Sequence, residues 1–186
     1  MCSHDLKQVR SAMQSEAKSR FRVLLYPLAI ALLTGVLFSN QAWGSFHSAP
    51  YFPIMNGVKW TYVENGFSSR TTTVAPGTTS VHGVATKALQ ESDGFISYWT
   101  SDSNGIRLHR EFEPHVFIDG VGTVALTTTF NPPIVVASGV TDIGQTANSS
   151  GTAETNLGNF SYSATFTIQT ADQISVPLRE FNALRV

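Results

Sequence analysis

The stretch FSYSATFTIQT, residues Phe160–Thr170, has the most regular hydrophobic pattern in the chain. Apolar and hydroxyl-bearing residues alternate with a period of two, so each set points to one face of an extended strand. The set expected to face the core is Phe160, Tyr162, Ala164, Phe166 and Ile168, and the set expected to face water is Ser161, Ser163, Thr165, Thr167 and Gln169. This pattern predicts an antiparallel sheet with one buried and one solvated face.

Comparable strand-like runs recur along the chain after Gly44, separated by turn residues about every 8–12 positions. Ser and Thr supply 34 of the 142 residues in this part, and long helix-favouring stretches are absent. These features predict an all-β domain, built as an antiparallel sandwich, a barrel or a strongly curved sheet. Two final strands are expected at Ile174–Leu178 and Phe181–Val186.

Three segments are expected to interrupt the strands. Proline cannot donate a hydrogen bond to a neighbouring strand, so we expect Glu113-Pro114-His115 to break or bend the chain and Asn131-Pro132-Pro133 to end a strand. Residues 138–159 contain repeated Gly and Asn and few large apolar groups. They predict a loop, with room for a short strand near Thr152–Thr155.

A second informative stretch, FISYWTSDSNGIRLHREF at Phe95–Phe112, has the plainest hairpin pattern. Asn104-Gly105 lies between two apolar-rich runs, and this pair suits the positive φ angles of a tight turn. In the second run apolar and ionisable residues alternate, as they do in a half-buried strand. We therefore expect two antiparallel strands with ionisable groups along the second.

The first 44 residues are typical of an export signal. Basic residues outnumber acidic ones by five to two in residues 1–22, the run Val23–Phe38 is apolar, and Ala42-Trp43-Gly44 offers the small residues of a signal-peptidase site. This order predicts a secretory signal peptide at residues 1–44 and a single exported β-domain at 45–186, periplasmic or extracellular. Either Met1 or Met13 can serve as the start.

An uncleaved membrane anchor is the alternative interpretation of the same segment. The apolar run is shorter than the roughly 20 residues that a spanning helix needs, and Pro27 and Gly35 weaken it further. The only cysteine, Cys2, precedes the run, so neither a disulfide nor a lipid-modified cysteine is expected in the exported part.

The charge of the exported part excludes one class of partner. After Gly44 there are 7 Lys and Arg against 11 Asp and Glu, a net charge of −4, and no basic run occurs. A mildly acidic surface is not that of a nucleic-acid-binding protein. Contact with a membrane is expected only through the signal segment, if that segment is not cleaved.

Two ends of the exported part carry a resemblance. YFPIMNGVKWTY at Tyr51–Tyr62 is similar to Y-F-P-L-x-x-G-x-x-W-x-Y, and VPLREFNALRV at Val176–Val186 is similar to V-P-A-G-x-F-x-A-L-x-V, with Leu178 and Arg179 in place of Ala-Gly. Thr100–Pro114 resembles the central part of the same proteins, which are uncharacterised bacterial exported proteins. The resemblance implies a curved sheet of the lipoprotein-carrier type and supplies no catalytic residues.

The chain stops at Val186 inside an expected strand. In the proteins that it resembles, the chain continues beyond the corresponding segment. Together these points predict that the sequence is partial at its C-terminal end.

The densest group of ionisable residues is His109, Glu111, Glu113 and His115. On a regular strand all four would project from one face, about 6–7 Å apart at each step. Imidazole and carboxylate groups are suitable zinc ligands, so His109, Glu111 and His115 are candidate metal ligands. The alternative is a solvated strand face on which charged groups such as Arg107 and Glu111 pair.

Other catalytic patterns are missing from the sequence. There is no G-x-S-x-G, no cysteine after Gly44 and no glycine-rich phosphate loop, so we expect neither a catalytic residue of those kinds nor a cofactor. The leading hypothesis is a non-enzymatic exported module, binding or structural, whose partner is a small apolar or carbohydrate ligand or a cell-envelope component. The alternatives are a metal-assisted hydrolase using His109, Glu111 and His115, and a cell-surface adhesion domain of a larger protein.

Overall fold

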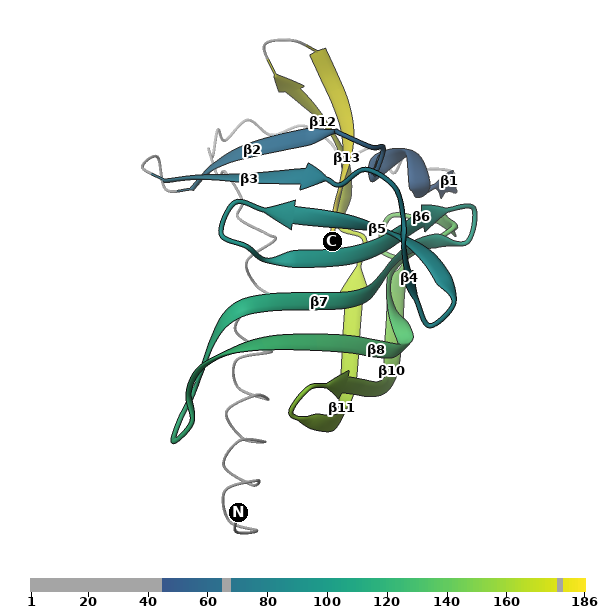
Figure 1. Cartoon of the computed structure of the whole chain (residues 1–186). Helices are drawn as coiled ribbons and strands as arrows, with labels where there is room; N and C mark the ends of the chain where they lie inside the picture. The colour runs from purple at the N-terminus through teal and green to yellow at the C-terminus, as the bar shows by residue number, and fades with distance from the viewer. Residues whose placement is uncertain (1–44, 65–67, 177–178) are drawn as a thin grey trace, which may run out of the picture.

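The computed structural model describes residues 45–64, 68–176 and 179–186 (Figure 1). The expected signal peptide, residues 1–44, lies outside the described residues. The strands are β1 (Phe46–His47), β2 (Lys59–Glu64), β3 (Ser68–Val74), β4 (Thr79–Val81), β5 (Val84–Glu91), β6 (Ile96–Asp102), β7 (Gly105–Ile118), β8 (Gly122–Ser138), β9 (Val140–Thr141), β10 (Thr146–Thr155), β11 (Gly158–Thr167), β12 (Thr170–Val176) and β13 (Arg179–Arg185). One 3-10 turn, η1 (Ala49–Tyr51), is the only helical element among these residues.

The expectation of an all-β antiparallel domain is confirmed. The main sheet has nine strands in the order β11-β10-β8-β7-β6-β5-β3-β2, with β4 paired to β5. Two further pairs, β1 with β9 and β12 with β13, complete the described strands. The main sheet is open, with β11 and β2 at its two edges, so it does not form the closed barrel that was one of the expected architectures.

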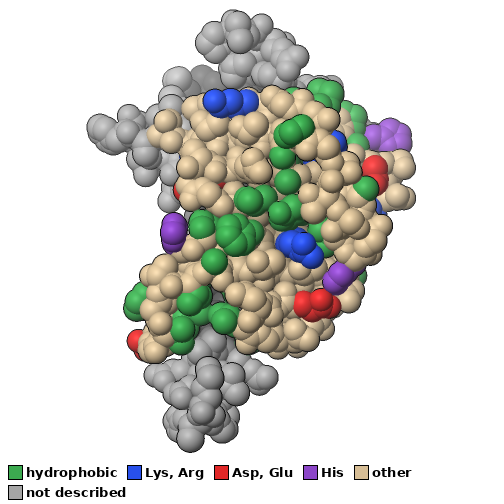
Figure 2. Space-filling view, in the orientation of Figure 1, with side chains coloured by type: hydrophobic (Ala, Val, Ile, Leu, Met, Phe, Trp, Pro, Cys, Tyr) green, Lys and Arg blue, Asp and Glu red, His purple; other side chains and the backbone are tan. Residues whose placement is uncertain are grey.

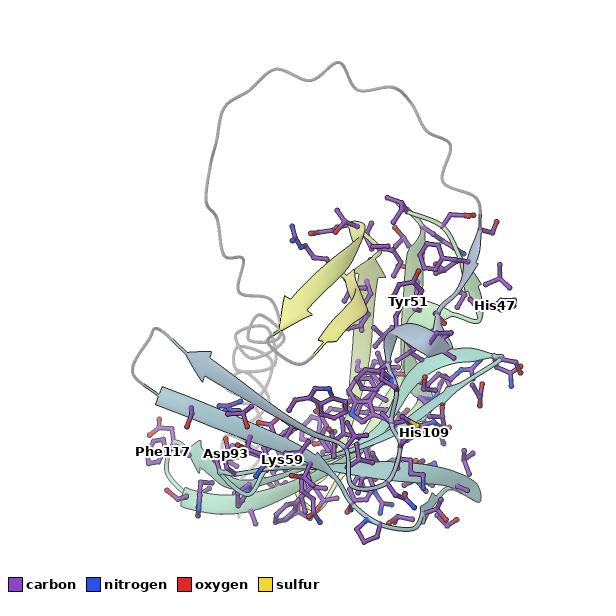
Figure 3. The ribbon with its side chains drawn as sticks, turned by 90° about the horizontal axis from the view of Figure 1, so that it is seen from above. His47, Tyr51, Lys59, Asp93, His109 and Phe117 are labelled. Carbon is purple, nitrogen blue, oxygen red and sulfur yellow. The ribbon has the colours of Figure 1, made fainter. Side chains whose placement is uncertain are left out.

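The sheet is bent. In Figure 1, β2, β3 and β5–β8 run across the front of the molecule, whereas β10 and β11 cross behind them in another direction. The view from above shows the same two parts, with the lead-in segment beside the rear part (Figure 3). Each part of the sheet therefore presents one inner face toward the other, and one outer face.

The apolar core lies on the inner face. Val74, Leu89, Trp99, Leu108, Phe130, Ile134 and Ile168 are among its buried members. The lead-in segment closes it, because Phe46, Phe52 and Ile54 pack against the buried residues, and the rings of Phe52 and Trp99 meet edge to face at 5.1 Å. The alternation expected for Phe160–Thr170 is confirmed: along β11 every second residue is sheltered, and Ile168 is buried.

The expected hairpin is confirmed, but its turn lies one residue before the expected Asn104-Gly105 pair. β6 and β7 pair from Ile96↔Phe112 to Asp102↔Gly105, so Ser103 and Asn104 form the turn and Gly105 already belongs to β7. The φ of Gly105 is 121°, and a Cβ there would lie 2.2 Å from the carbonyl oxygen of Ala137. Glycine is needed at this position because the backbone of β8 lies too close to leave room for a side chain.

The expected stop at Pro132-Pro133 is wrong, and at Pro114, where a break or a bend was expected, the strand continues with irregular pairing. β7 continues through Pro114 to Ile118, and β8 continues through Pro132 and Pro133 to Ser138. Both strands tolerate proline because the pairing is irregular there: the β7–β8 register shifts between Glu113 and Val116 and again between Leu108 and Arg110. At such irregularities a ladder hydrogen bond is already missing, so the absent proline N–H costs little.

The prediction of a loop over residues 138–159 is also wrong. β10 occupies Thr146–Thr155 and pairs along its whole length with β11. It lacks large apolar residues because space beside it is short: a Cβ on Gly151 would lie 2.3 Å from the carbonyl oxygen of Asn131 and 2.6 Å from Cδ of Pro132. Small residues here permit close approach of β8, and a pattern based on large side chains misses the strand.

In the part of the chain that the structure describes, there is no helix with the length and apolar character needed to span a bilayer.

Candidate functional site

The candidate site lies where the apolar inner face becomes polar. Pairing places Val74 opposite Leu89, Leu89 opposite Ser97, Ser97 opposite Glu111, and Glu111 opposite Thr128. Directly opposed residues of an antiparallel sheet share one face, so these five side chains form one row across β3, β5, β6, β7 and β8. Val74 and Leu89 belong to the core, and Glu111 therefore points to the same inner face.

Ser97 and Trp99 join this row to the core. Both side chains are buried, and Nε1 of Trp99 donates a hydrogen bond to Oγ of Ser97 at 2.7 Å. Because Ser97 is the cross-strand neighbour of Glu111, the indole of Trp99 lies one step from the Glu111 carboxyl along the inner face. The intrinsic fluorescence of Trp99 is thus a natural reporter for events at Glu111.

The Glu111 carboxyl has an unusual environment. Burial, and after it the neighbouring carboxyl groups of Glu113 and Glu91, raise its pKa from 4.5 to about 7. Loss of solvent disfavours a negative charge, and a nearby like charge does the same. Within the described part of the chain, the Glu111 carboxyl makes no hydrogen bond. Near neutral pH it is therefore a carboxyl that can either donate or accept a hydrogen bond.

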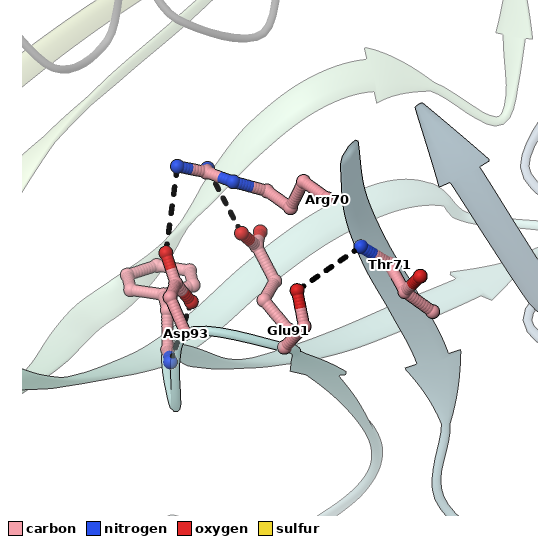
Figure 4. Close-up of polar contacts among 6 residues, drawn as sticks. Arg70, Thr71, Glu91 and Asp93 are labelled. Atoms are coloured by element: carbon pink, nitrogen blue, oxygen red, sulfur yellow. Dashed lines mark hydrogen bonds and ion pairs between the residues drawn. The ribbon is translucent and has the colours of Figure 1, made fainter. Parts of the chain in front are cut away.

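Glu91 reaches the same inner face from β5. It lies two residues beyond Leu89 and opposite Thr72, and its Oε2 accepts a hydrogen bond from Nη1 of Arg70 at 2.9 Å. The other guanidinium nitrogen, Nη2, lies 3.4 Å from Oδ2 of Asp93 (Figure 4). Arg70 on β3 thus holds the carboxyl group of Glu91 at the end of β5 and lies beside that of Asp93 in the following turn.

The turn between β5 and β6 is held by further polar contacts. The backbone N–H of Thr71 donates to Oγ of Ser92 at 3.2 Å, and the N–H of Phe95 donates to Oδ1 of Asp93 at 3.1 Å (Figure 4). Asp93 lies at the end of the sheet opposite to Tyr51 and the lead-in segment (Figure 3). The polar end of the inner face is therefore distant from the segment that closes the core.

His109 does not join Glu111, and the expectation of a common face for the two is wrong. The β6–β7 register shifts between Tyr98 and Trp99, so Leu108 pairs with Trp99 whereas Arg110 pairs with Tyr98. This bulge at His109 places Leu108 and Arg110 on opposite faces although they are two residues apart. The change of face puts Glu111 on the inner face.

His109 belongs to the outer face instead. Its Nε2 and Oγ1 of Thr100 lie 3.0 Å apart in a hydrogen bond, and the ring is buried. Burial lowers the pKa of His109, and the charge of Arg107 lowers it further. The imidazole is therefore neutral at neutral pH and serves as a hydrogen-bonded part of the packed strand.

The third candidate ligand, His115, is exposed in the irregular part of β7, after Pro114. The structure thus separates the three candidates: Glu111 lies on the inner face, His109 is buried on the outer face, and His115 is solvent-exposed. In residues 45–64, 68–176 and 179–186 no three His, Cys, Asp or Glu side chains are grouped so that they could hold a metal ion.

The outer face carries its own aromatic and charged groups. Ile96 is opposite Phe112 and Tyr98 is opposite Arg110, whose guanidinium lies 5.8 Å from the centre of the Tyr98 ring. Figure 2 shows this face, with apolar side chains gathered in its middle and basic groups among them. The turn between β4 and β5 adds His82, whose Nε2 lies 3.2 Å from Oε2 of Glu154.

Sequence reasoning identified Glu111 but missed its neighbours. Glu91 and Arg70 come from other strands, and only the register of the sheet brings them to the same face. The available signal was the spacing of Leu89 and Glu91, because residues two apart in a strand lie on the same face.

No family model, no curated protein and no solved structure matches the chain in comparisons with known proteins. The function is therefore argued from the site alone.

Proposed function

We propose that this protein is an exported, non-enzymatic binding module, periplasmic or extracellular, whose ligand is bound on the inner face of the bent sheet at Glu111. The ligand class is an amphiphilic small molecule of the cell envelope. It has an apolar body and a polar end that donates hydrogen bonds or carries a positive charge.

One observation supports this proposal above the others. The half-buried carboxyl of Glu111 has a pKa raised to about 7, and it lies in the same row as the core residue Leu89. Loss of solvent and nearby like charges disfavour the ionised form of such a carboxyl. A ligand group that donates a hydrogen bond or carries a positive charge would offset this cost.

The surroundings of Glu111 indicate the chemistry of the ligand. The carboxyl groups of Glu113 and Glu91 make the local field negative, which favours an ammonium or hydroxyl group and disfavours a phosphate or carboxylate. Trp60 is opposite Thr72, which is opposite Glu91, so its partly exposed indole lies on the same face and favours a hydrocarbon body. The exported location is inferred from the signal-like pattern of residues 1–44, and the all-β fold is compatible with it.

Binding of simple amphiphiles tests the proposal. A long-chain alkylamine, the alkyl alcohol of equal length and the corresponding alkyl sulfate, each below its micelle concentration, would be titrated at pH 8 while the tryptophan fluorescence is followed. We expect the amine to bind most tightly and the sulfate least. Glu111→Gln should lose the preference for the amine.

The matched control is Asp119→Asn, which makes the same acid-to-amide change at an exposed turn. It should bind like the wild type. Equal affinity for amine and sulfate, or an unchanged preference in Glu111→Gln, would refute ligand recognition by this carboxyl.

A further inference from the structure

The β7–β8 hairpin extends beyond its neighbours as a two-stranded arm. β6 pairs with β7 only as far as Phe112, and β10 pairs with β8 only from Thr128 onward. Among the described strands, residues 113–118 and 122–126 therefore pair only with each other. In Figure 1 this arm leaves the body of the sheet at the lower left, and its turn lies at the far end.

The tip of the arm carries two exposed apolar side chains. Phe117 is 65% exposed and Val121 is 55% exposed. They lie at a tight turn, in which the N–H of Val121 donates to the carbonyl of Ile118 at 3.0 Å. Val116 and Ile118 are buried, so Phe117, which lies between them in the strand, points to the opposite, solvated face.

This pair differs from the other exposed apolar residues. Three more large apolar side chains of the described chain are exposed, and each lies on a different segment: Met55, Val84 and Val140. Single exposed apolar side chains are common on protein surfaces and need no explanation. Two at the end of a projecting turn form an apolar tip, and Figure 2 shows apolar side chains gathered at the lower left, where the arm lies in Figure 1.

The charge of the arm excludes an anionic partner. Its ionisable residues are Glu113, His115 and Asp119, and the sequence contains no Lys or Arg between Arg110 and Arg179. Anionic lipid surfaces attract segments rich in Lys and Arg. An apolar tip with acidic neighbours fits a surface without net charge.

The size of the tip argues against a folded protein as its partner. Phe117 and Val121 together expose on the order of 200 Å² of surface. One side of a stable protein–protein interface covers about 800 Å². A lipid bilayer needs neither this area nor a complementary shape, because apolar side chains enter the boundary between headgroups and acyl chains. At that depth the backbone of the arm remains hydrated.

We propose that the tip of the β7–β8 arm is a membrane-contact element, in which Phe117 and Val121 enter the interface of a zwitterionic lipid bilayer. The sequence indicated no membrane contact outside residues 1–44, because these two residues belong to no long apolar run. The inference does not rest on the ligand proposed at Glu111, since it uses the tip of the arm and not the inner face. Glu111 is six residues before Phe117 on β7, about 20 Å away, so the contact would also hold the inner face near the bilayer.

A fluorophore at the tip tests the contact. Val121→Cys, in a Cys2→Ser background, would be labelled with the polarity-sensitive dye NBD and mixed with phosphatidylcholine vesicles. The protein would be used as its host processes it. We expect the emission to shift to the blue and to become stronger. The dye reports contact at its own position, so binding through residues 1–44 would not mimic this result.

The matched control carries the same dye at Val140→Cys. Val140 is 53% exposed and is opposite His47, which lies at the other end of the molecule from Phe117 (Figure 3). Its emission should not change when vesicles are added.

Unlabelled variants measure the strength of the contact through sedimentation with phosphatidylcholine vesicles. Phe117→Ser should lower the partition coefficient at least about tenfold, because a large apolar side chain no longer leaves water. Met55→Ser removes a similarly exposed side chain from the lead-in segment and should leave the coefficient unchanged. Circular dichroism would check that each variant keeps its strand content.

An unchanged emission at position 121, an equal shift at position 140, or equal partition of Phe117→Ser and the wild type would overturn the proposal. A shift that requires phosphatidylglycerol would overturn the assignment to a zwitterionic bilayer. A blue shift that grows with protein concentration in the absence of vesicles would show that a second copy of the chain covers the tip, and would overturn the proposal as well.

Discussion

Replacing Glu111 by glutamine should stabilise the protein at neutral and alkaline pH. Glutamine has nearly the shape of glutamic acid and cannot ionise. In the folded protein the pKa of Glu111 is raised from 4.5 to about 7 by burial and by its acidic neighbours. Between these two values the folded state keeps a proton that the unfolded state has released, so the free energy of unfolding falls as the pH rises.

The size of the effect follows from the two pKa values. Each pH unit is worth about 1.4 kcal/mol, so ionisation of Glu111 costs the folded state up to about 3 kcal/mol above pH 7. Below pH 4.5 the cost vanishes because the carboxyl is protonated in both states. Glu111→Gln should therefore match the wild type near pH 4 and exceed it by up to about 3 kcal/mol at pH 8, or roughly 10 °C in Tm.

Urea denaturation at a series of pH values, followed by tryptophan fluorescence, measures this difference directly. The exposed control Asp119→Asn should show a small difference from the wild type that does not grow between pH 5 and 8. A difference between Glu111→Gln and the wild type that is constant over this range would refute the argument. It would mean that the Glu111 carboxyl is ionised in the folded protein as easily as in the unfolded chain.

Three further outcomes are expected. Thr100→Val removes the hydrogen-bond partner of buried His109 and should lower the free energy of unfolding at pH 7 by about 1–2 kcal/mol. Thr100→Ser keeps the hydroxyl group and should retain most of the wild-type stability. Equal free energies of unfolding for the two variants would contradict the role of this bond. Gly151→Ala places a Cβ 2.3 Å from the carbonyl oxygen of Asn131 and should cost about 1–3 kcal/mol in urea denaturation; a neutral effect would show that β8 and β10 can separate without loss. Added zinc should leave the melting temperature unchanged, and a zinc-dependent rise that is lost in His115→Ala would show that a metal site exists.

The sequence predicted the parts of the fold that depend on local alternation. The hydroxyl-apolar pattern of β11 and the Asn-Gly signal of the β6–β7 hairpin were sufficient, because strand faces and tight turns are decided by neighbouring residues. The continuation of β7 through Pro114 and of β8 through Pro132 could not be predicted, because it depends on register shifts between strands that are distant in the sequence.

The candidate site was predicted in part for the same reason. Glu111 was identified from its strand, but the partners assigned to it, His109 and His115, assumed an unbroken alternation. A single bulge at His109 reverses the face of the residues that follow, and this cannot be read from composition. The actual neighbour Glu91 is brought to the site by pairing of β5 with β6 and of β6 with β7.

The short lead-in segment also bears on the order of events during the export proposed above. Its first strand, β1, begins at Phe46 and pairs with β9, where Phe46 is opposite Thr141. The expected cleavage point before Ser45 is therefore next to a residue that is part of the folded core. Proteases act on extended chain, and a strand already in a sheet is a poor substrate.

Because β9 is synthesised long after the lead-in segment, there is an interval in which the proposed cleavage point is still extended. Removal of the signal is expected within that interval, before the segment docks. A chain that folds first would keep its leader. The speed of processing relative to folding would then decide how much mature protein is released.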